Sequence, residues 1–490
     1  MRALSLSLVL ACLLSLLLTP VVRRLALRLG ALDPFSARKV VALRPIPRLG
    51  GLAVALSFYL TLTVLWLSGS VLTRATLASD TPVLTIVIGS VPILLIGALD
   101  DLRGLRALPK LTVEILVGLG LWLSGLRIEA TALLGLDLMR LPPSLAAALS
   151  CALTLAWLVG VMNATNLIDG LDGLAGGVAL FALATTAVAA LLRGDLLLAL
   201  LVVALFGAVV GFLFFNLQPA SIFLGDAGSL FLGYLLAATA IWSVRKAATT
   251  VLLVCPAVAL GLPLLDTSLT ISRRLLSGRP LMQGDRDHVH HRLRGRFGTR
   301  RAVLLLYAIC ATFSALALAM LLGGQGASRL ALLAAALFAL ALGYSLGYLR
   351  GGPRGLWQAL RRRRQTQRVL RAVMDFASRA AHARDGVALS SELSALSADL
   401  GFSVRIVIPP PADASDPSAS PTDAVTYPIG HDQRVVAQLI VHAAEPDLSR
   451  SPDGIAGAAG PDTQALLQLL CDLLGPIVAR LPPPAQAPRT

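Results

Sequence analysis

The segment VMNATNLIDGLDGLAGG, residues 161–177, lies between two apolar runs and is more polar than a turn between membrane helices requires. Its polar side chains recur every three residues, so a helix or a tight helical turn would direct them to one side. They are Asn163, Asn166, Asp169 and Asp172. Glycines at 170, 173, 176 and 177 would let the backbone approach a ligand closely. Because a carboxylate in or beside hydrocarbon is costly and usually functional, the segment indicates a binding site, with a plain turn as the alternative.

The composition around this segment is that of a membrane protein. Hydrophobic residues make up 56% of the 490 residues, charged residues 14%, and the mean hydropathy is +0.77, which excludes an ordinary soluble domain. The net charge of +15 comes mostly from arginine. In a membrane protein such a charge reports topology and attraction to anionic lipid, so the bilayer is an expected partner and nucleic acid is not. The five cysteines are too far apart for a disulfide framework or a zinc site.

The chain contains about eleven apolar spans of bilayer length, which predicts an all-α polytopic membrane protein. The expected spans are 3–22, 49–68, 83–99, 109–126, 145–161, 174–192, 196–215, 229–244, 249–271, 302–322 and 328–349. The first is followed by Arg23, Arg24 and Arg28 and has no small-residue cleavage site, so it is expected to be a retained helix and not a signal peptide.

Basic residues concentrate in the odd-numbered loops between these spans, above all in residues 23–48, 103–110 and 273–301. The even-numbered loops carry only scattered basic residues. The positive-inside rule therefore places the odd loops in the cytoplasm and the N-terminus outside. With eleven spans the C-terminus is cytoplasmic, in agreement with the run Arg361–Arg364 after the last span.

Each odd-numbered loop contains a polar cluster, so the clusters share one membrane face. They lie within 37–51, 98–111, 161–177, 216–233 and 285–293. A membrane-embedded active site would be assembled in this way, by five loops that converge on one face of the membrane.

Three carboxylates in these clusters are candidates for catalysis. Asp100 and Asp101 are adjacent, and such a pair can hold a divalent cation or keep one carboxylate basic, with a solvated helix end as the alternative. Asp226 lies in a Gly-Asp-Ala-Gly turn before a helix expected to begin near Ser229. Mg²⁺ takes oxygen ligands and keeps water or substrate phosphate in its other positions, and a helix start can present N–H groups to phosphate.

Histidines and basic residues in two of these loops suggest contacts with a metal ion or with a diphosphate. His288, His290 and His291 fall within four residues, which permits a zinc or nickel site. Arg292 and neighbouring arginines would repel a cation and instead suit a diphosphate, and Lys39 offers the same charge from the first loop. Phe223, beside Asp226, is placed to stack on a base, with ordinary packing as the alternative.

Taken together, these motifs resemble the polyprenyl-phosphate N-acetylhexosamine-1-phosphate transferases. The similarity covers residues 30 to about 300 and rests on Asp-Asp at 100–101, Asn-x-x-Asn-x-x-Asp-Gly-x-Asp-Gly at 163–173 and Asn-x-x-Pro-Ala-x-x-Phe-Leu-Gly-Asp-x-Gly-Ser at 216–229. The resemblance implies that Asp226 binds Mg²⁺, with Mn²⁺ as a substitute, and that Asp100 and Asp101 are candidate bases. It further implies a nucleotide site, with Phe223 against uracil and five polar residues lining it: Asn163, Asn166, Asp169, Asp172 and Asn216.

The resemblance also favours one branch of this superfamily. Asp-Arg-x-His-x-His-His-Arg-Leu at 285–293 is similar to the branch that moves GlcNAc-1-phosphate from UDP-GlcNAc to undecaprenyl phosphate. The same chemistry on another UDP-N-acetylhexosamine or on UDP-MurNAc-pentapeptide is the alternative. Val41 stands where related sequences usually have histidine, which makes Lys39 a less secure phosphate contact. A receptor or transporter is the rival class, but it would not need Asp100, Asp101 and Asp226 together.

The remainder, 351–490, differs from the membrane part and is expected to be a small cytoplasmic α+β domain with a regulatory or scaffolding role. A basic helix at 355–381 precedes a strand at 402–408, a hairpin of strands at 424–429 and 434–441, and a helix at 463–480. The order of elements weakly resembles a GAF-type sensor domain. The oligomeric state stays open, with a homodimer among the states considered.

Overall fold

A computed structural model describes residues 2–33, 45–69, 82–129, 142–245, 251–277 and 288–346, with shorter stretches between 371 and 443. The chain divides into two compact units. One comprises Met1–Leu275 and Pro280–Arg350, and the other comprises Leu276–Arg279 and Gly351–Thr490.

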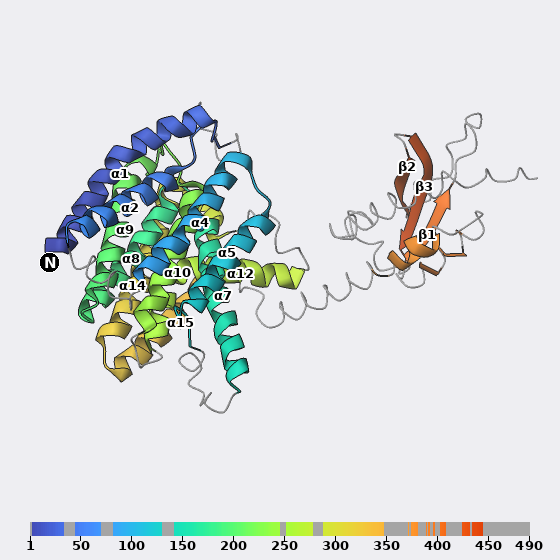
Figure 1. Ribbon diagram of the computed structural model, residues 1–490. Coiled ribbons are helices and arrows are strands. Elements are labelled where there is room, and N and C mark those ends of the chain that lie inside the picture. The colour runs from blue at the N-terminus through green and yellow to red at the C-terminus, as the bar shows by residue number, and fades with distance from the viewer. Residues whose placement is uncertain are drawn as a thin grey trace, which may run out of the picture. The chain divides into compact units, whose positions relative to one another are not determined.

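The first unit is a bundle of helices (Figure 1). Its described helices are α1 (Arg2–Leu29), α2 (Gly50–Leu67), α4 (Val83–Arg103), α5 (Ala107–Leu123), α7 (Pro143–Ile168), α8 (Leu174–Leu192), α9 (Leu196–Asn216), α10 (Gly225–Arg245), α11 (Val251–Ala259), α12 (Gly261–Ser277), α13 (Val289–Phe297), α14 (Thr299–Leu322) and α15 (Gln325–Ser345).

Within the described residues, eight helices are long and apolar enough to cross a membrane: α1, α2, α4, α7, α8, α9, α14 and α15. The prediction of a polytopic helical protein is thus confirmed, whereas the count of eleven is not reproduced. The other three expected spans correspond to α5, to α10 and to the pair α11 and α12. The span expected at 249–271 is broken because Pro263 has no N–H and its ring would clash with the carbonyl of Ala259, so a new helix begins at Gly261.

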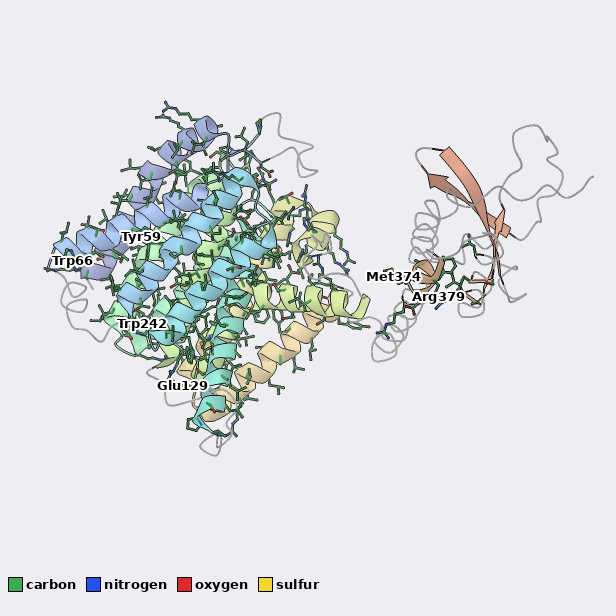
Figure 2. The ribbon with its side chains drawn as sticks, turned by 45° about the vertical axis from the view of Figure 1, so that its right-hand side comes forward. Tyr59, Trp66, Glu129, Trp242, Met374 and Arg379 are labelled. Carbon is green, nitrogen blue, oxygen red and sulfur yellow. The ribbon has the colours of Figure 1, made fainter. Side chains whose placement is uncertain are left out.

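The centre of the bundle is formed by α9 and α10. Of the 18 residues in the most apolar stretch of α9, 72% are buried, whereas the corresponding share is 28% in α1 and 22% in α15. α9 therefore lies inside the bundle, and α1 and α15 lie at its periphery. Phe231 and Tyr234 of α10 are fully buried, and α10 packs against α2, α4, α7 and α8. Tyr59 of α2 (labelled in Figure 2) contacts Phe231 edge-on and exchanges a hydrogen bond with Ser90 of α4 at 2.6 Å. An apolar helix buried on all sides is expected at such a centre.

Small residues allow α1 to approach α9 closely. A Cβ atom added to Gly207 would lie 2.4 Å from the carbonyl oxygen of Leu8, and one added to Gly211 would lie 2.5 Å from that of Cys12. The facing side of α1 carries the small buried residues Ala11 and Ser15. Packing of small residues spaced by four is a common basis of helix association in membranes.

The second unit contains a three-stranded antiparallel sheet with strand order β1-β3-β2. Its strands are β1 (Phe402–Val407), β2 (Ala424–His431) and β3 (Arg434–Ala443). They cover the three runs expected as strands, except that Ile408 lies outside the described residues. The helix expected at 463–480 lies outside the described residues.

Candidate active site

The start of α10 is fixed by a carboxylate from another helix. Asp101, near the end of α4, accepts hydrogen bonds from the backbone N–H groups of Asp226 at 2.9 Å and Ala227 at 3.0 Å. Gly225 has a φ of +74°, and a Cβ atom there would lie 2.4 Å from Asp101 Oδ2, so only glycine fits this turn. Because Asp101 satisfies these otherwise free N–H groups, α10 begins at Gly225 and not near Ser229 as expected, which puts Asp226 in its first turn.

Lys110 of α5 connects two of the predicted carboxylates. Its Nζ lies 2.8 Å from Asp100 Oδ2 and 2.8 Å from Asp226 Oδ2. Asn166 donates to the same oxygen of Asp226 at 3.3 Å and accepts a hydrogen bond from Ser229 at 2.9 Å. Two carboxylate oxygens therefore converge on one cation, at the point where α4, α5, α7 and α10 meet.

The two asparagines of α7 face different neighbours. Asn163 Nδ2 donates to Glu114 Oε2 at 2.6 Å, whereas Asn166 faces Asp226. Residues three apart on an α-helix differ by about 60° in direction, so a spacing of three does not keep side chains on one line. α7 also ends at Ile168, so the helical spacing does not extend to Asp169 and Asp172. The prediction that all four side chains project to one side was wrong for Asn163.

Hydrogen bonds join the segment after α7 to the segment after α9. Asn216 accepts from the N–H of Gly173 at 3.1 Å and donates to the carbonyl of Ile222 at 2.9 Å. Asp172 accepts from the N–H of Ala220 at 3.1 Å. The hydroxyl of Tyr307 on α14 donates to the carbonyl of Gly173 at 2.7 Å.

The segment before α2 is joined to the segment before α10 by the backbone. The N–H groups of Gly50 and Gly51 donate to the carbonyls of Phe223 at 2.9 Å and Leu224 at 2.8 Å, and the N–H of Phe223 donates to Pro47 at 2.9 Å. Next to these residues, Arg48 forms an ion pair with buried Asp33.

These segments enclose a cavity of about 160 Å³. Its lining contains seven of the predicted site residues, and they are Asp101, Asn166, Asp169, Asp172, Asn216, Phe223 and Asp226. Arg48, Gly170, Leu171 and Gly225 complete the lining. Asp100 is linked to the cavity through Lys110, and Lys39 lies outside the described residues.

The histidines do not line this cavity. His288 and His290 are buried and face Asp266 of α12, with Nδ1 to Oδ2 distances of 3.4 Å and 3.6 Å. His291 is half-buried, and Arg292 donates to the carbonyl of Leu346 at 2.8 Å. Among the described residues, no group of three metal-ligating side chains is assembled, so nothing in that part of the chain supports zinc or nickel at the histidines.

Four residues of this region were not predicted as site residues: Arg48, Lys110, Glu114 and Asp266. The sequence contains a signal for three of them. Lys110 and Glu114 stand in the apolar run 107–123, and Asp266 stands in the apolar run 249–271. An ionisable residue inside an apolar span is by default a functional candidate, although in the charge pattern Lys110 is only one of the basic residues at 103–110.

The arrangement fits a divalent cation. Asp100 and Asp226 each direct one oxygen at a common point that already holds the ammonium group of Lys110. Mg²⁺ prefers carboxylate oxygens and needs only one or two of them when substrate phosphate and water supply the rest. The carboxylate of Asp226 therefore suits Mg²⁺, and substrate phosphate and water would supply the remaining ligands.

The part of the chain that contains these motifs is similar to known proteins. The family model for glycosyl transferase family 4 matches residues 83–244, the part that contains α4, α5, α7, α8, α9 and nearly all of α10. A relative from Bacillus subtilis (strain 168), named "Probable undecaprenyl-phosphate N-acetylglucosaminyl 1-phosphate transferase", is 37% identical over 307 residues, which are 61% of this chain and 80% of the relative. The chain belongs to glycosyl transferase family 4.

Other relatives of this chain carry related names. A decaprenyl-phosphate N-acetylglucosaminephosphotransferase of Mycolicibacterium smegmatis is 36% identical over 323 residues, 58% of this chain and 74% of the relative. A phospho-N-acetylmuramoyl-pentapeptide-transferase of Streptococcus mutans is 34% identical over 209 residues, 40% of this chain and 58% of the relative. The superfamily indicated by the motifs is thereby confirmed.

Proposed function

We propose that this protein transfers N-acetylglucosamine-1-phosphate from UDP-GlcNAc to undecaprenyl phosphate. The products are undecaprenyl-diphosphate-GlcNAc and UMP, and the reaction is the first membrane step of a cell-envelope polysaccharide. The observation that carries the proposal is the convergence of Asp101, Asn166, Asp169, Asp172, Asn216, Phe223 and Asp226 on one cavity of a membrane-spanning family 4 protein. The names of the relatives support the sugar and the acceptor.

In the proposed reaction an oxygen of the acceptor phosphate attacks the β-phosphorus of the donor. The bond from the β-phosphorus to the bridging oxygen breaks, and UMP leaves with that oxygen. One phosphoanhydride replaces another, so the protein has little covalent work to do. Positioning and neutralisation of charge then account for most of the catalysis.

The contacts of each side chain suggest its part in this reaction. Asp101 accepts two N–H groups of α10, and Asp100 accepts the N–H of Leu105 and pairs with Lys110, so both carboxylates stay candidates for the base that keeps the acceptor phosphate ionised. Arg48 faces the cavity and suits the donor diphosphate. Phe223 is suited to stack on the uracil ring. Asp169, Asp172 and the other polar residues of the cavity lining are suited to bind the polar groups of the nucleotide and sugar. Mg²⁺ at Asp226 would neutralise the diphosphate charge.

The orientation of the protein in the membrane follows from the distribution of arginine between the loops. We place the cavity and the second unit on the cytoplasmic side of a bacterial inner membrane, with α5, α10 and the α11–α12 pair completing eleven crossings. The long isoprenoid of the acceptor would stay in the bilayer, which accounts for an active site at a membrane edge. The second unit is proposed as a regulatory or scaffolding α+β domain.

The function is tested by incubating the purified protein in detergent with Mg²⁺, undecaprenyl phosphate and one radiolabelled UDP-sugar at a time. We expect label from UDP-GlcNAc to become soluble in organic solvent, with UMP released in equal amount, and the chelator EDTA to stop the transfer. Label from UDP-MurNAc-pentapeptide alone would move the protein to the alternative branch. Binding of a UDP-sugar with no transfer of any label would favour a receptor or transporter.

The orientation is tested by labelling introduced cysteines in intact cells, after the five native cysteines have been replaced. A cysteine at position 135 should react with a membrane-impermeant maleimide, and a cysteine after Arg364 should react only after the cells are opened. Labelling of the second position in intact cells would show that the number of crossings is even, and the polar loops would lose their common face.

A further inference from the structure

Asp266 connects α12 to the start of α13 inside the first unit. It lies on α12, its Oδ1 accepts a hydrogen bond from the N–H of Val289 at 2.9 Å, and its Oδ2 faces the Nδ1 atoms of His288 and His290. Asp266, His288 and His290 are exposed by only 2%, 4% and 1%. A buried carboxylate is costly unless it is paired, so this group requires its partners to stay in place.

The other nitrogen of His290 lies against the cavity wall. A Cβ atom added to Gly170 would lie only 2.3 Å from His290 Nε2, which means that the imidazole edge touches the backbone of Gly170. Gly170 itself lines the cavity, between Asp169 and Asp172. One face of the segment 169–172 therefore borders the cavity, and the other rests on a histidine whose opposite nitrogen faces Asp266.

We propose that Asp266 and His290 form a buried support that sets the position of the segment 169–172 and thereby the affinity for the sugar nucleotide. Asp266 is a positioning residue in this scheme: it orients the imidazole, and the imidazole holds Gly170. The proposal rests on the proposed function for the identity of the ligand, UDP-GlcNAc. The competing explanation is that the pair only ties α12 to α13 and has no influence on the cavity.

The test uses Gly170→Ala, His290→Ala and the double variant, each measured for the dissociation constant of UDP-GlcNAc by calorimetry in detergent. Gly170 does not have a positive φ, so alanine there is opposed by the imidazole and not by backbone strain. Each single variant should weaken binding about tenfold. Removal of the imidazole leaves room for the added methyl group, so the double variant should bind within about twofold of His290→Ala alone.

Asp266→Asn supplies the second measurement. It keeps the size of the side chain and the bond to Val289 but loses the charge that orients His290, so we expect about a fivefold weaker affinity in the wild-type background and less than about a twofold effect in the His290→Ala background. Asp195→Asn, at the start of α9 on the far end of that helix from Asn216, is the matched control and should bind as the wild type does.

Additive effects of Gly170→Ala and His290→Ala, or an equal effect of Asp266→Asn in both backgrounds, would overturn the proposal. Melting temperatures separate these results from general unfolding, because a change in affinity at unchanged thermal stability cannot come from loss of the fold. Since the readout is binding, a wild-type protein that binds UDP-GlcNAc but transfers nothing would refute the proposed function and leave the support testable. A wild-type protein that does not bind UDP-GlcNAc would refute both.

Discussion

Asp226→Asn should reduce transfer of the sugar phosphate by about a thousandfold or more, at every Mg²⁺ concentration. The amide has the same volume and can still accept hydrogen bonds from Lys110 and Asn166, so the first turn of α10 should keep its structure. What is lost is the negative charge that would hold the metal ion against the donor diphosphate. The measurement is the rate of lipid-linked product formation across a range of Mg²⁺ concentrations.

Binding of Mn²⁺, followed by its electron paramagnetic resonance signal, provides a readout that does not depend on turnover. We expect the wild type to bind one ion in this region and Asp226→Asn to bind it at least about tenfold more weakly, with the melting temperature unchanged. A variant that keeps a tenth or more of the wild-type rate would show that Asp226 is not the essential metal ligand.

Asp101→Asn is expected to cost both stability and activity, because this side chain needs both of its oxygens. Each oxygen accepts one N–H group at the start of α10, and an asparagine has only one acceptor oxygen. Its NH₂ group would face a backbone N–H, leaving buried donors unsatisfied at a cost of about 1–3 kcal/mol. The first turn of α10 would shift and carry Asp226 with it, so we expect about a hundredfold lower rate together with a lower melting temperature.

Asp195→Asn is the matched control for this change. Asp195 also accepts a backbone N–H at a helix start, that of Leu198 at 3.2 Å, but asparagine and aspartate cap this position about equally well. The control should therefore leave the rate and the melting temperature nearly unchanged. If Asp101→Asn behaved like the control, the role of Asp101 in holding Asp226 would be refuted.

Much of the site could be predicted from the sequence because its motifs follow apolar spans. Loops on one side of a membrane are brought close by the bundle itself, and so Asp101, Asp169, Asn216 and Asp226 meet at one cavity. The predicted helices were found for the same reason, since a bilayer span is a long and simple pattern.

The contacts that the sequence did not predict have a different origin, because they depend on which side chains lie against each other in the folded protein. Spacing cannot tell that Asn163 faces Glu114, because the partner lies on α5 and is remote in sequence. The histidines are predicted as substrate contacts because histidine next to arginine suits phosphate, and spacing does not show that Asp266 on α12 faces two of them. The break before α12 depends on Pro263, and a proline inside a continuous apolar run can either kink a helix or end it, so hydropathy alone does not predict the break.

The backbone pairing between residues 47–51 and 223–224 has a consequence for chimeras made with relatives. The carbonyls of Phe223 and Leu224 serve as the N-terminal cap of α2, and a Cβ atom on Gly51 would lie 2.0 Å from the backbone nitrogen of Gly228. These two segments, far apart in the sequence, therefore form a single exchangeable part. A graft of one donor's segment should fold only when its counterpart comes from the same donor, or when glycine is kept at 51 and 228.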